Sequence, residues 1–123
     1  MNKKEIGKNA ENYAAEYLKS LGYEITERNW SCRLGEIDII ARDGDELVFA
    51  EIRCRKKTSA ITPADTVSYS KQIRIRNAIE QYICDNNLNM RVRFDFVGVL
   101  YSQICGEVCF EIQCHLKNTE LAE

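Results

Sequence analysis

The chain has no long apolar run. Nowhere do its 123 residues approach the roughly 18 consecutive apolar residues that a membrane-spanning helix needs. The first five residues, Met-Asn-Lys-Lys-Glu, also lack the apolar stretch of a signal peptide. With 45% hydrophobic and 29% charged residues, the composition predicts one soluble domain over residues 1–123, without a membrane association.

The cysteine spacing that is typical of structural zinc sites is absent. None of the six cysteines forms a Cys-x-x-Cys pair. Cys105, Cys109, Cys114 and His115 could be interpreted as zinc ligands, but a closed zinc site needs four converging ligands. In a regular strand Cys109 and Cys114 face opposite sides. The alternation instead predicts a core stripe of Val108, Phe110, Ile112 and Cys114. We therefore expect reduced core cysteines and a cytoplasmic location.

The chain also lacks an excess of positive charge. Its net charge of −2 and isoelectric point near 5.5 argue against general adhesion to nucleic acid. The cations are nevertheless uneven, with many of them between residues 53 and 76. This basic stripe is either a solvated surface or a phosphate track. It comprises Arg53, Arg55, Lys56, Lys57, Lys71, Arg74 and Arg76.

Residues 35–54 are the most informative segment. Two apolar runs of strand length flank Asp43-Gly44, which predicts a tight β-hairpin. With Asp43-Gly44 as the turn, Asp38 lies diagonal to Glu51, and with Gly44-Asp45 as the turn it lies directly opposite. In both registers the two carboxylates share one face of the sheet, about 5 to 8 Å apart at Cβ.

The acid pair predicts a divalent-metal site. Ile, Leu, Val, Phe and Ala surround Asp38 and Glu51 on both strand faces, as in an interior strand pair. Acids in such strands are rarely buried without a partner. We therefore favour a site made of Asp38, Glu51 and the nearby cation Arg53 over a surface ion pair of Glu51 and Arg53.

The other segments predict helices that flank a mixed sheet. Amphipathic spacing predicts a helix over residues 4–21, with Glu11 at the border of its apolar face. Thr62-Pro63 is typical of a helix start, and a second helix is expected up to about Asp85, with an open question about a break near residues 68–70. Strands are expected over residues 23–30, 35–54 (the hairpin), 92–101 and 107–115. The order α-β-β-β-α-β-β predicts an α/β fold with a central five-stranded mixed sheet.

Several motifs together resemble one protein family. They are Glu11-x2-Ala14-x3-Leu18-x3-Gly22, Gly35-Glu36-Ile37-Asp38-Ile39-Ile40, Phe49-Ala50-Glu51-Ile52-Arg53, Lys71 and Arg93-Phe94-Asp95. Over nearly its whole length the chain resembles the YraN-like family of uncharacterised bacterial proteins. That family resembles the archaeal Holliday-junction resolvases and belongs to the restriction-endonuclease-like, PD-(D/E)xK superfamily.

The resemblance implies a nuclease-type metal site with one or two Mg²⁺ (or Mn²⁺) ions. Asp38 matches the first acidic ligand, Glu51 the second, and Glu11 the helix acid that resolvases add. Arg53 stands where the superfamily usually has lysine; because arginine keeps its proton, Arg53 can stabilise charge but cannot act as the base. Asp95 belongs to a family motif without an assigned role, and we interpret it as a structural partner of Arg93 or a nearby cation.

The expected function is metal-dependent hydrolysis of structured or branched DNA, in a homodimer by analogy with the resolvases. The expected DNA-binding residues are Arg55, Lys56, Lys57, Lys71, Gln72 and Arg74. Two alternatives stay open, because membership of a fold does not certify activity. One is a nucleic-acid-binding module without turnover, and the other is an interaction subunit whose acidic surface docks onto a DNA-processing assembly.

Overall fold

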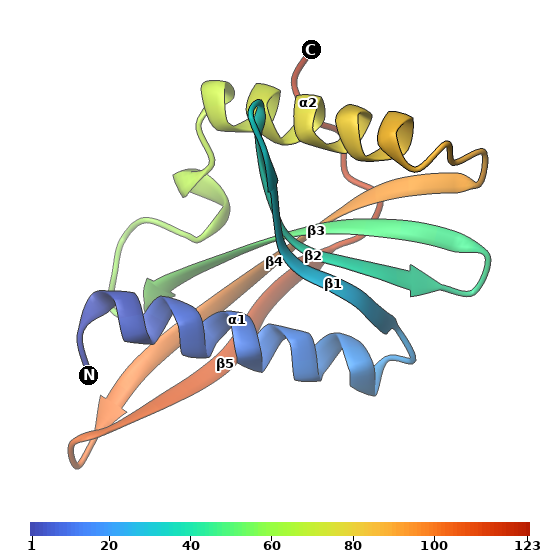
Figure 1. Ribbon diagram of the computed structural model, residues 1–123. Coiled ribbons are helices and arrows are strands. Elements are labelled where there is room, and N and C mark those ends of the chain that lie inside the picture. The colour runs from blue at the N-terminus through green and yellow to red at the C-terminus, as the bar shows by residue number, and fades with distance from the viewer.

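The computed structural model, which describes residues 1–123, is an α/β fold with two α-helices and a five-stranded mixed sheet (Figure 1). The predicted order α-β-β-β-α-β-β is confirmed. The elements are α1 (Lys3–Ser20), β1 (Glu24–Cys32), β2 (Gly35–Asp43), β3 (Glu46–Lys56), the 3-10 helix η1 (Ala64–Thr66), α2 (Tyr69–Asp85), β4 (Arg91–Ile104) and β5 (Glu107–Leu116).

The strands lie side by side in chain order, β1-β2-β3-β4-β5. Neighbouring strands are antiparallel except β3 and β4, which are parallel. A parallel pair needs a crossover connection, and α2 with its flanking loops supplies it. The sheet therefore combines an N-terminal meander with a C-terminal hairpin, and β3 lies at its centre.

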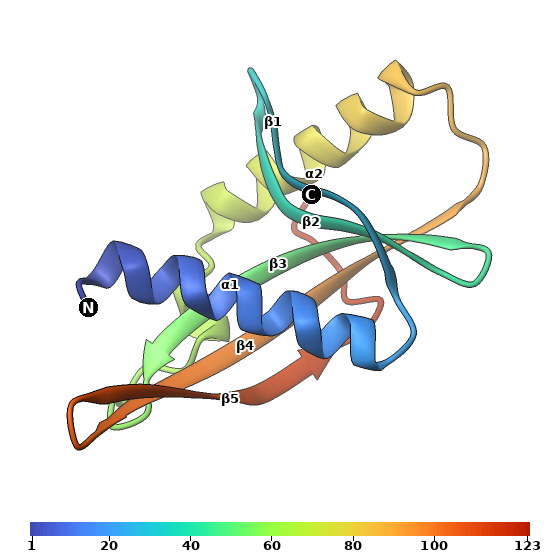
Figure 2. The ribbon, with the colours of Figure 1, turned by 60° about the horizontal axis from the view of Figure 1, so that its bottom comes forward.

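The two helices cover opposite faces of the sheet (Figures 1 and 2). Along β3, Val48, Ala50 and Ile52 belong to an apolar cluster under α1, whereas Leu47 and Phe49 belong to a second cluster under α2. Both faces of β3 are thus buried, which explains its nearly continuous apolar sequence. Neither helix is long and apolar enough to cross a membrane.

The second helix starts later than the sequence predicts. Thr62-Pro63 leads only into η1, and the chain is extended again at Val67. The helix α2 begins after Ser68, whose Oγ accepts a hydrogen bond from the backbone N–H of Lys71 at 3.1 Å. Serine is a strong N-cap, so it interrupts the predicted helix near residues 68–70. As a result, Lys71 lies in the first turn of α2.

The predicted core stripe on β5 is wrong at its C-terminal end. Val99 pairs with Ile112, but Gly98 pairs with Cys114, so one extra residue lies between them on β5. This bulge turns Cys114 into the cluster under α2, while Phe110 and Ile112 pack in the cluster under α1. The bulge also places Cys109 and Cys114 on the same face, contrary to the prediction. All six cysteines are free, but none is fully buried and Cys84, Cys105 and Cys109 are exposed, so the expectation of core cysteines is wrong for these three.

Candidate active site

The candidate site lies where β2 leaves β3. The hairpin closes with Asp43 opposite Glu46, so Gly44 and Asp45 form its turn. This is the register that places Asp38 opposite Glu51. The backbone pairing of β2 with β3, however, ends at Ile39 and Ala50, one pair before this position. Beyond it the Asp38 side chain forms the next contact between the strands: its Oδ2 accepts a hydrogen bond from Ile52 N–H at 2.8 Å.

The other end of β2 is held by α2 instead of β3. Beyond Asp38, β2 still pairs with β1, and this hairpin reaches α2 (Figure 1). Gly35 lies directly against the helix backbone, since a Cβ at this position would lie 2.6 Å from the carbonyl oxygen of Arg74. Trp30 packs edge-on against Tyr82, with ring centroids 5.2 Å apart. These contacts draw β2 away from β3 and leave the two acids at the point of separation.

Glu51 is almost completely buried, with 3% of its surface exposed. Burial, the charge of Asp38 and a hydrogen bond with Asp38 together raise the pKa of Glu51 to about 8. The charges of Lys71 and Arg53 act in the opposite direction. The two carboxylates are therefore close neighbours in a poorly solvated place, and a cation between them would relieve their repulsion.

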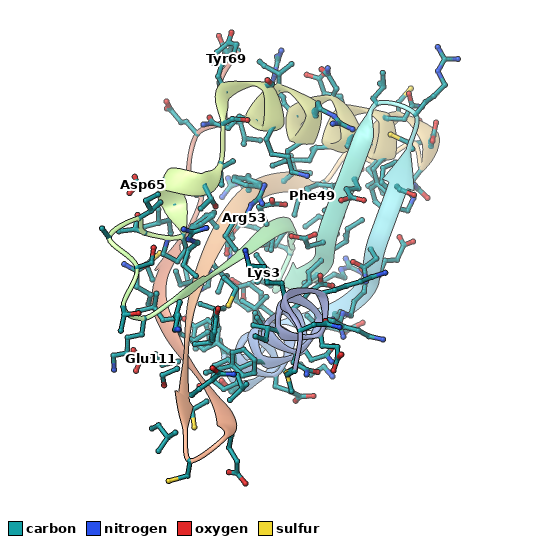
Figure 3. The ribbon with its side chains drawn as sticks, turned by 90° about the vertical axis from the view of Figure 1, so that its left-hand side faces the viewer. Lys3, Phe49, Arg53, Asp65, Tyr69 and Glu111 are labelled. Carbon is teal, nitrogen blue, oxygen red and sulfur yellow. The ribbon has the colours of Figure 1, made fainter.

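Arg53 forms an ion pair with Glu51 but no hydrogen bond. Its Nε lies 3.0 Å from Glu51 Oε2, yet the N–H is not aligned for a hydrogen bond and this buried donor has no other partner. Figure 3 shows Arg53 on the side of the molecule between α1 and α2. A buried, unpaired N–H on a permanent cation is free to donate to an anion that enters the site.

Glu11 approaches the acid pair from α1. Burial and the charge of Asp38 raise the pKa of Glu11, while a hydrogen bond and the charge of Arg28 oppose this shift. Arg28 Nη2 lies 3.2 Å from Glu11 Oε1. No group of three or more His, Cys, Asp or Glu side chains is close enough to hold a metal ion. The structure thus brings together two acids and leaves Glu11 beside them, bound to arginine.

Three adjoining pockets form a groove that passes Asp38 and Glu11. A central pocket of about 350 Å³ is lined by Asp38, Glu11 and Arg53, among others. It shares Arg55 with a pocket of about 330 Å³ at the start of α1, and it shares Glu11 and Asp38 with a polar pocket of about 640 Å³ beside β1. Figure 3 shows Lys3 at the start of α1 on this side. We call these pockets together the groove.

The groove contains cations that the sequence did not single out. They are Lys3, Lys4, Lys8 and Arg28. The spacing of Lys4, Lys8 and Glu11 is a signal that could have been used, because residues at i, i+4 and i+7 share one face of a helix. Arg28 had no such local signal, since its position depends on how β1 packs beside α1.

The basic stripe is divided between different places. Arg55 and Lys56 line the groove, and Lys71 lies near Glu51 and 4.0 Å from Glu36. Lys57 instead forms an ion pair with Glu111 at 3.2 Å. Two further stripe residues lie away from the groove: Arg74 is exposed on α2, and Arg76 lies 3.7 Å from Glu80. Gln72, also an expected DNA-binding residue, lies outside the groove as well, where it donates to Val67 O and accepts from Ala122 N.

Asp95 lies in a buried polar network on the α1 face of the sheet, outside the groove. Arg93 Nε donates to Asp95 Oδ1 at 3.1 Å, and His115 Nε2 lies 2.8 Å from Oδ2. Burial raises the pKa of Asp95, but hydrogen bonds from His115, Arg93, Asn118 N–H and Tyr23 outweigh it and hold the pKa well below its usual range. The interpretation of Asp95 as a structural partner of Arg93 is confirmed.

The fold and the site define an α/β protein with a pair of carboxylates beside a polar groove. The chain belongs to the uncharacterised protein family UPF0102, whose family model matches residues 10–99. This confirms the YraN-like family resemblance of its sequence. It is 42% identical over 103 residues to a UPF0102 protein of Dictyoglomus turgidum, which covers 83% of this chain and 87% of that protein.

Other relatives carry the same family name. The chain is 44% identical over 100 residues to a UPF0102 protein of Carboxydothermus hydrogenoformans, covering 80% of this chain and 85% of that protein. It is 43% identical over 96 residues to one of Rhodococcus opacus, covering 77% and 81% of the two chains. These names assign a family and no activity.

Proposed function

We propose that this protein is a metal-dependent nuclease that hydrolyses phosphodiester bonds in structured or branched DNA. The observation that carries the proposal is the pair formed by Asp38 and Glu51. Two adjacent carboxylates, one of them almost completely buried, are costly unless a cation or a proton joins them. Asp38 lines the groove together with Arg53, and the position of the pair at this groove gives that cost a functional explanation.

The donor set fits a hard divalent cation. Mg²⁺ is usually bound by one or two protein carboxylates, with waters and substrate phosphate completing its shell. Asp38 and Glu51 would hold it, and the backbone hydrogen bond from Ile52 uses only Oδ2 of Asp38 and leaves Oδ1 available. Mn²⁺ suits the same oxygen ligands. When bound, such an ion activates a water molecule and stabilises the charge that develops on the phosphate.

The side chains around the acids have complementary roles. Arg53 would donate its buried Nε–H to the phosphate that is attacked and stabilise the developing negative charge. Lys71 would lower the cost of ionising Glu51, because its charge already lowers the Glu51 pKa. Neither role requires a proton to leave Arg53, in agreement with the permanent charge of arginine.

The charge distribution favours a selective substrate. The groove is lined by seven cations, Lys3, Lys4, Lys8, Arg28, Arg53, Arg55 and Lys56, but the whole chain has a net charge of −2. Such a protein has little electrostatic attraction for duplex DNA in general. A DNA whose strands separate or branch can place a single strand in the groove, so structured or branched DNA is the substrate class that fits this charge distribution. A homodimer, as in the resolvases, would present two such grooves.

The test is cleavage of labelled linear duplex, single-stranded, flapped and four-way-junction DNA with and without Mg²⁺ or Mn²⁺. We expect metal-dependent cleavage that is strongest on flapped or junction DNA. Asp38→Asn and Glu51→Gln should abolish it while leaving DNA binding intact. Glu80→Gln, the same kind of change on the exposed side of α2, is the matched control and should cleave like the wild type.

Two results would contradict this proposal. Cleavage that survives Asp38→Asn would come from another site or a contaminant. DNA binding without cleavage on any substrate would favour a nucleic-acid-binding module. The presence of Arg53 at the position of the usual lysine favours that second candidate, because the side chain at this position keeps its proton and cannot act as a base.

A further inference from the structure

One end of the groove is the pocket at the start of α1, which adjoins the central pocket lined by Asp38. It has a volume of about 330 Å³, in the size range of small-molecule sites. Three of its lining residues are cations, Lys3, Arg55 and Lys56, and none is an acid. The remaining lining residues are Ile6, Gly7, Cys54, Ser59 and Tyr101.

The three cations have no carboxylate partners in the structure. Some cations near this side do have one, such as Lys57 with Glu111 and Arg28 with Glu11, whereas Lys4 and Lys8 also have none. Arg55 Nη2 donates to Ser59 Oγ at 3.3 Å, while its buried Nε has no hydrogen-bond partner. Three positive charges gathered around one pocket repel each other, and an anion in the pocket would replace this repulsion by attraction.

We propose that this pocket binds a backbone phosphate of the nucleic-acid strand whose neighbouring phosphate lies at Asp38 and Glu51. This inference rests on the proposed function. The pocket shares Gly7, Cys54 and Arg55 with the central pocket, so one strand can pass through both. The Tyr101 ring and Ile6 supply an apolar surface for the attached sugar or base, and the positive N-terminal end of α1 adds to the attraction.

The pocket would therefore position the substrate rather than take part in the chemistry. Its Lys and Arg side chains lie beyond the acid pair, and a phosphate held there would fix which bond of the strand lies at Asp38 and Glu51. Because phosphate contacts set register without reading the bases, the preference is for a charged strand of any sequence.

The test measures binding of a fluorescein-labelled single-stranded decanucleotide by anisotropy without divalent metal, so that no cleavage occurs. We expect Lys56→Gln and Lys3→Gln each to weaken binding about tenfold, the loss of one charge-assisted contact. Lys19→Gln, at the far end of α1 and paired with Glu16, is the control for loss of one positive charge and should bind like the wild type. An equal loss of strand affinity in all three variants would overturn the proposal that this pocket binds a phosphate.

A second measurement identifies the ligand. In two-dimensional NMR, titration with inorganic phosphate should shift the amide signals of Ser59 and Tyr101 in the wild type and much less in Lys56→Gln. Unchanged signals up to high phosphate concentration would overturn the proposal. The same titration with a decanucleotide should move these signals at far lower concentration, as expected for a strand and not for the free anion.

The outcomes separate this inference from the proposed function. If wild-type protein never cleaves DNA but Lys56→Gln weakens strand binding, the pocket stands and the nuclease proposal fails. If wild-type protein cleaves DNA and Lys56→Gln leaves both KM and strand binding unchanged, the nuclease proposal stands and the pocket fails.

Discussion

Glu51 is the residue at which stability and function oppose each other most directly. An unfolded glutamate ionises with a pKa near 4.5, whereas burial and Asp38 raise the pKa of folded Glu51 to about 8. Between these values the folded protein retains a proton that the unfolded chain releases. The free energy of unfolding therefore falls as the pH rises through this window, and the loss is complete above pH 8.

A first prediction follows for Glu51→Gln. The variant should be more stable than the wild type at pH 9 without divalent metal, by about 2 kcal/mol, because it removes a buried charge and keeps the shape. At pH 4 the two proteins should be nearly equal. Thermal unfolding at several pH values measures the difference, and Mg²⁺ should then raise the Tm of the wild type only. Parallel pH profiles for both proteins would contradict this account of Glu51.

The second prediction tests the proposed function at Arg53, which on that proposal takes the place of the lysine usual in nucleases. If Arg53 supplies only fixed positive charge, Arg53→Lys should retain cleavage and make it more dependent on pH, because burial lowers the pKa of a lysine. The pH profile of kcat/KM for wild type and variant provides the measurement. Equal pH dependence in both proteins would show that this position does not titrate, and loss of cleavage would show that the guanidinium shape is needed.

Asp95 provides a third prediction. Its carboxylate is fully buried and is bound by Arg93, His115, Tyr23 and Asn118 N–H. Asp95→Asn should lower the free energy of unfolding by about 3 kcal/mol at pH 7, since it replaces the fully buried carboxylate that accepts from Arg93 and Tyr23 with a neutral amide. Arg93 then keeps only its more exposed partners Asp43, at 2.8 Å, and Glu46, at 2.9 Å. Because the Asp95 pKa is lowered by folding, this contribution is complete above its usual pKa near 3.8 and is lost as the pH falls. Urea unfolding at pH 7 and pH 3 tests both statements.

At the scale of elements, the decisive feature is the β1–β2 hairpin, which leaves β3 and packs on α2. Gly35 permits the close approach, because any Cβ would lie 2.6 Å from the Arg74 carbonyl oxygen and only 3.1 Å from its carbon. These are backbone atoms that cannot move without shifting the helix. The opening between β2 and β3 therefore depends on a residue that has no side chain.

The fourth prediction tests this contact with Gly35→Ala. The variant should be less stable by about 2 kcal/mol, the usual cost of overpacking. It should also weaken Mg²⁺ binding at Asp38, because the end of β2 moves. Gly7→Ala is the matched control: it lies within α1, a Cβ there would meet no atom within 4 Å, and the change should be stabilising by about 0.5–1 kcal/mol. Calorimetric Tm values and Mg²⁺ titrations separate the two variants, and equal behaviour would contradict the role of Gly35.

At the scale of the whole molecule, the groove concentrates positive charge on a protein that is acidic in total. Seven cations line it, and this number sets an upper limit on the phosphates that the groove can neutralise. The slope of log K against log salt should therefore be no steeper than about −6 for duplex DNA. A steeper slope would require a binding surface outside the groove.

A fifth prediction compares two neighbouring lysines of the basic stripe. Lys56 lines the groove, whereas Lys57 is paired with Glu111 on β5. Lys56→Glu should weaken DNA binding and flatten its salt dependence more than Lys57→Glu does, because fewer counterions are then released. Binding isotherms at several salt concentrations give both slopes. Equal effects would show that the stripe acts only through its total charge.

The sequence by itself determined the element order, the hairpin and the sharing of one face by Asp38 and Glu51. These features depend on neighbours within a few residues: hydrophobic periodicity selects helix or strand, and a short turn sets the parity of the two strands. The pairing of Arg93 with Asp95 could be predicted for the same reason, because residues two apart on a strand lie on one face.

Only the tertiary structure decided where the remaining side chains lie. The departure of β2 from β3 depends on Gly35 meeting Arg74, and the bulge that turns Cys114 to the α2 side depends on pairing with β4. Lys3 and Arg55 line the same pocket, and Ala122 in the C-terminal segment donates a hydrogen bond to the Gln72 side chain. Such contacts join residues far apart in the chain, and no local propensity encodes which of several exposed side chains a distant element will reach.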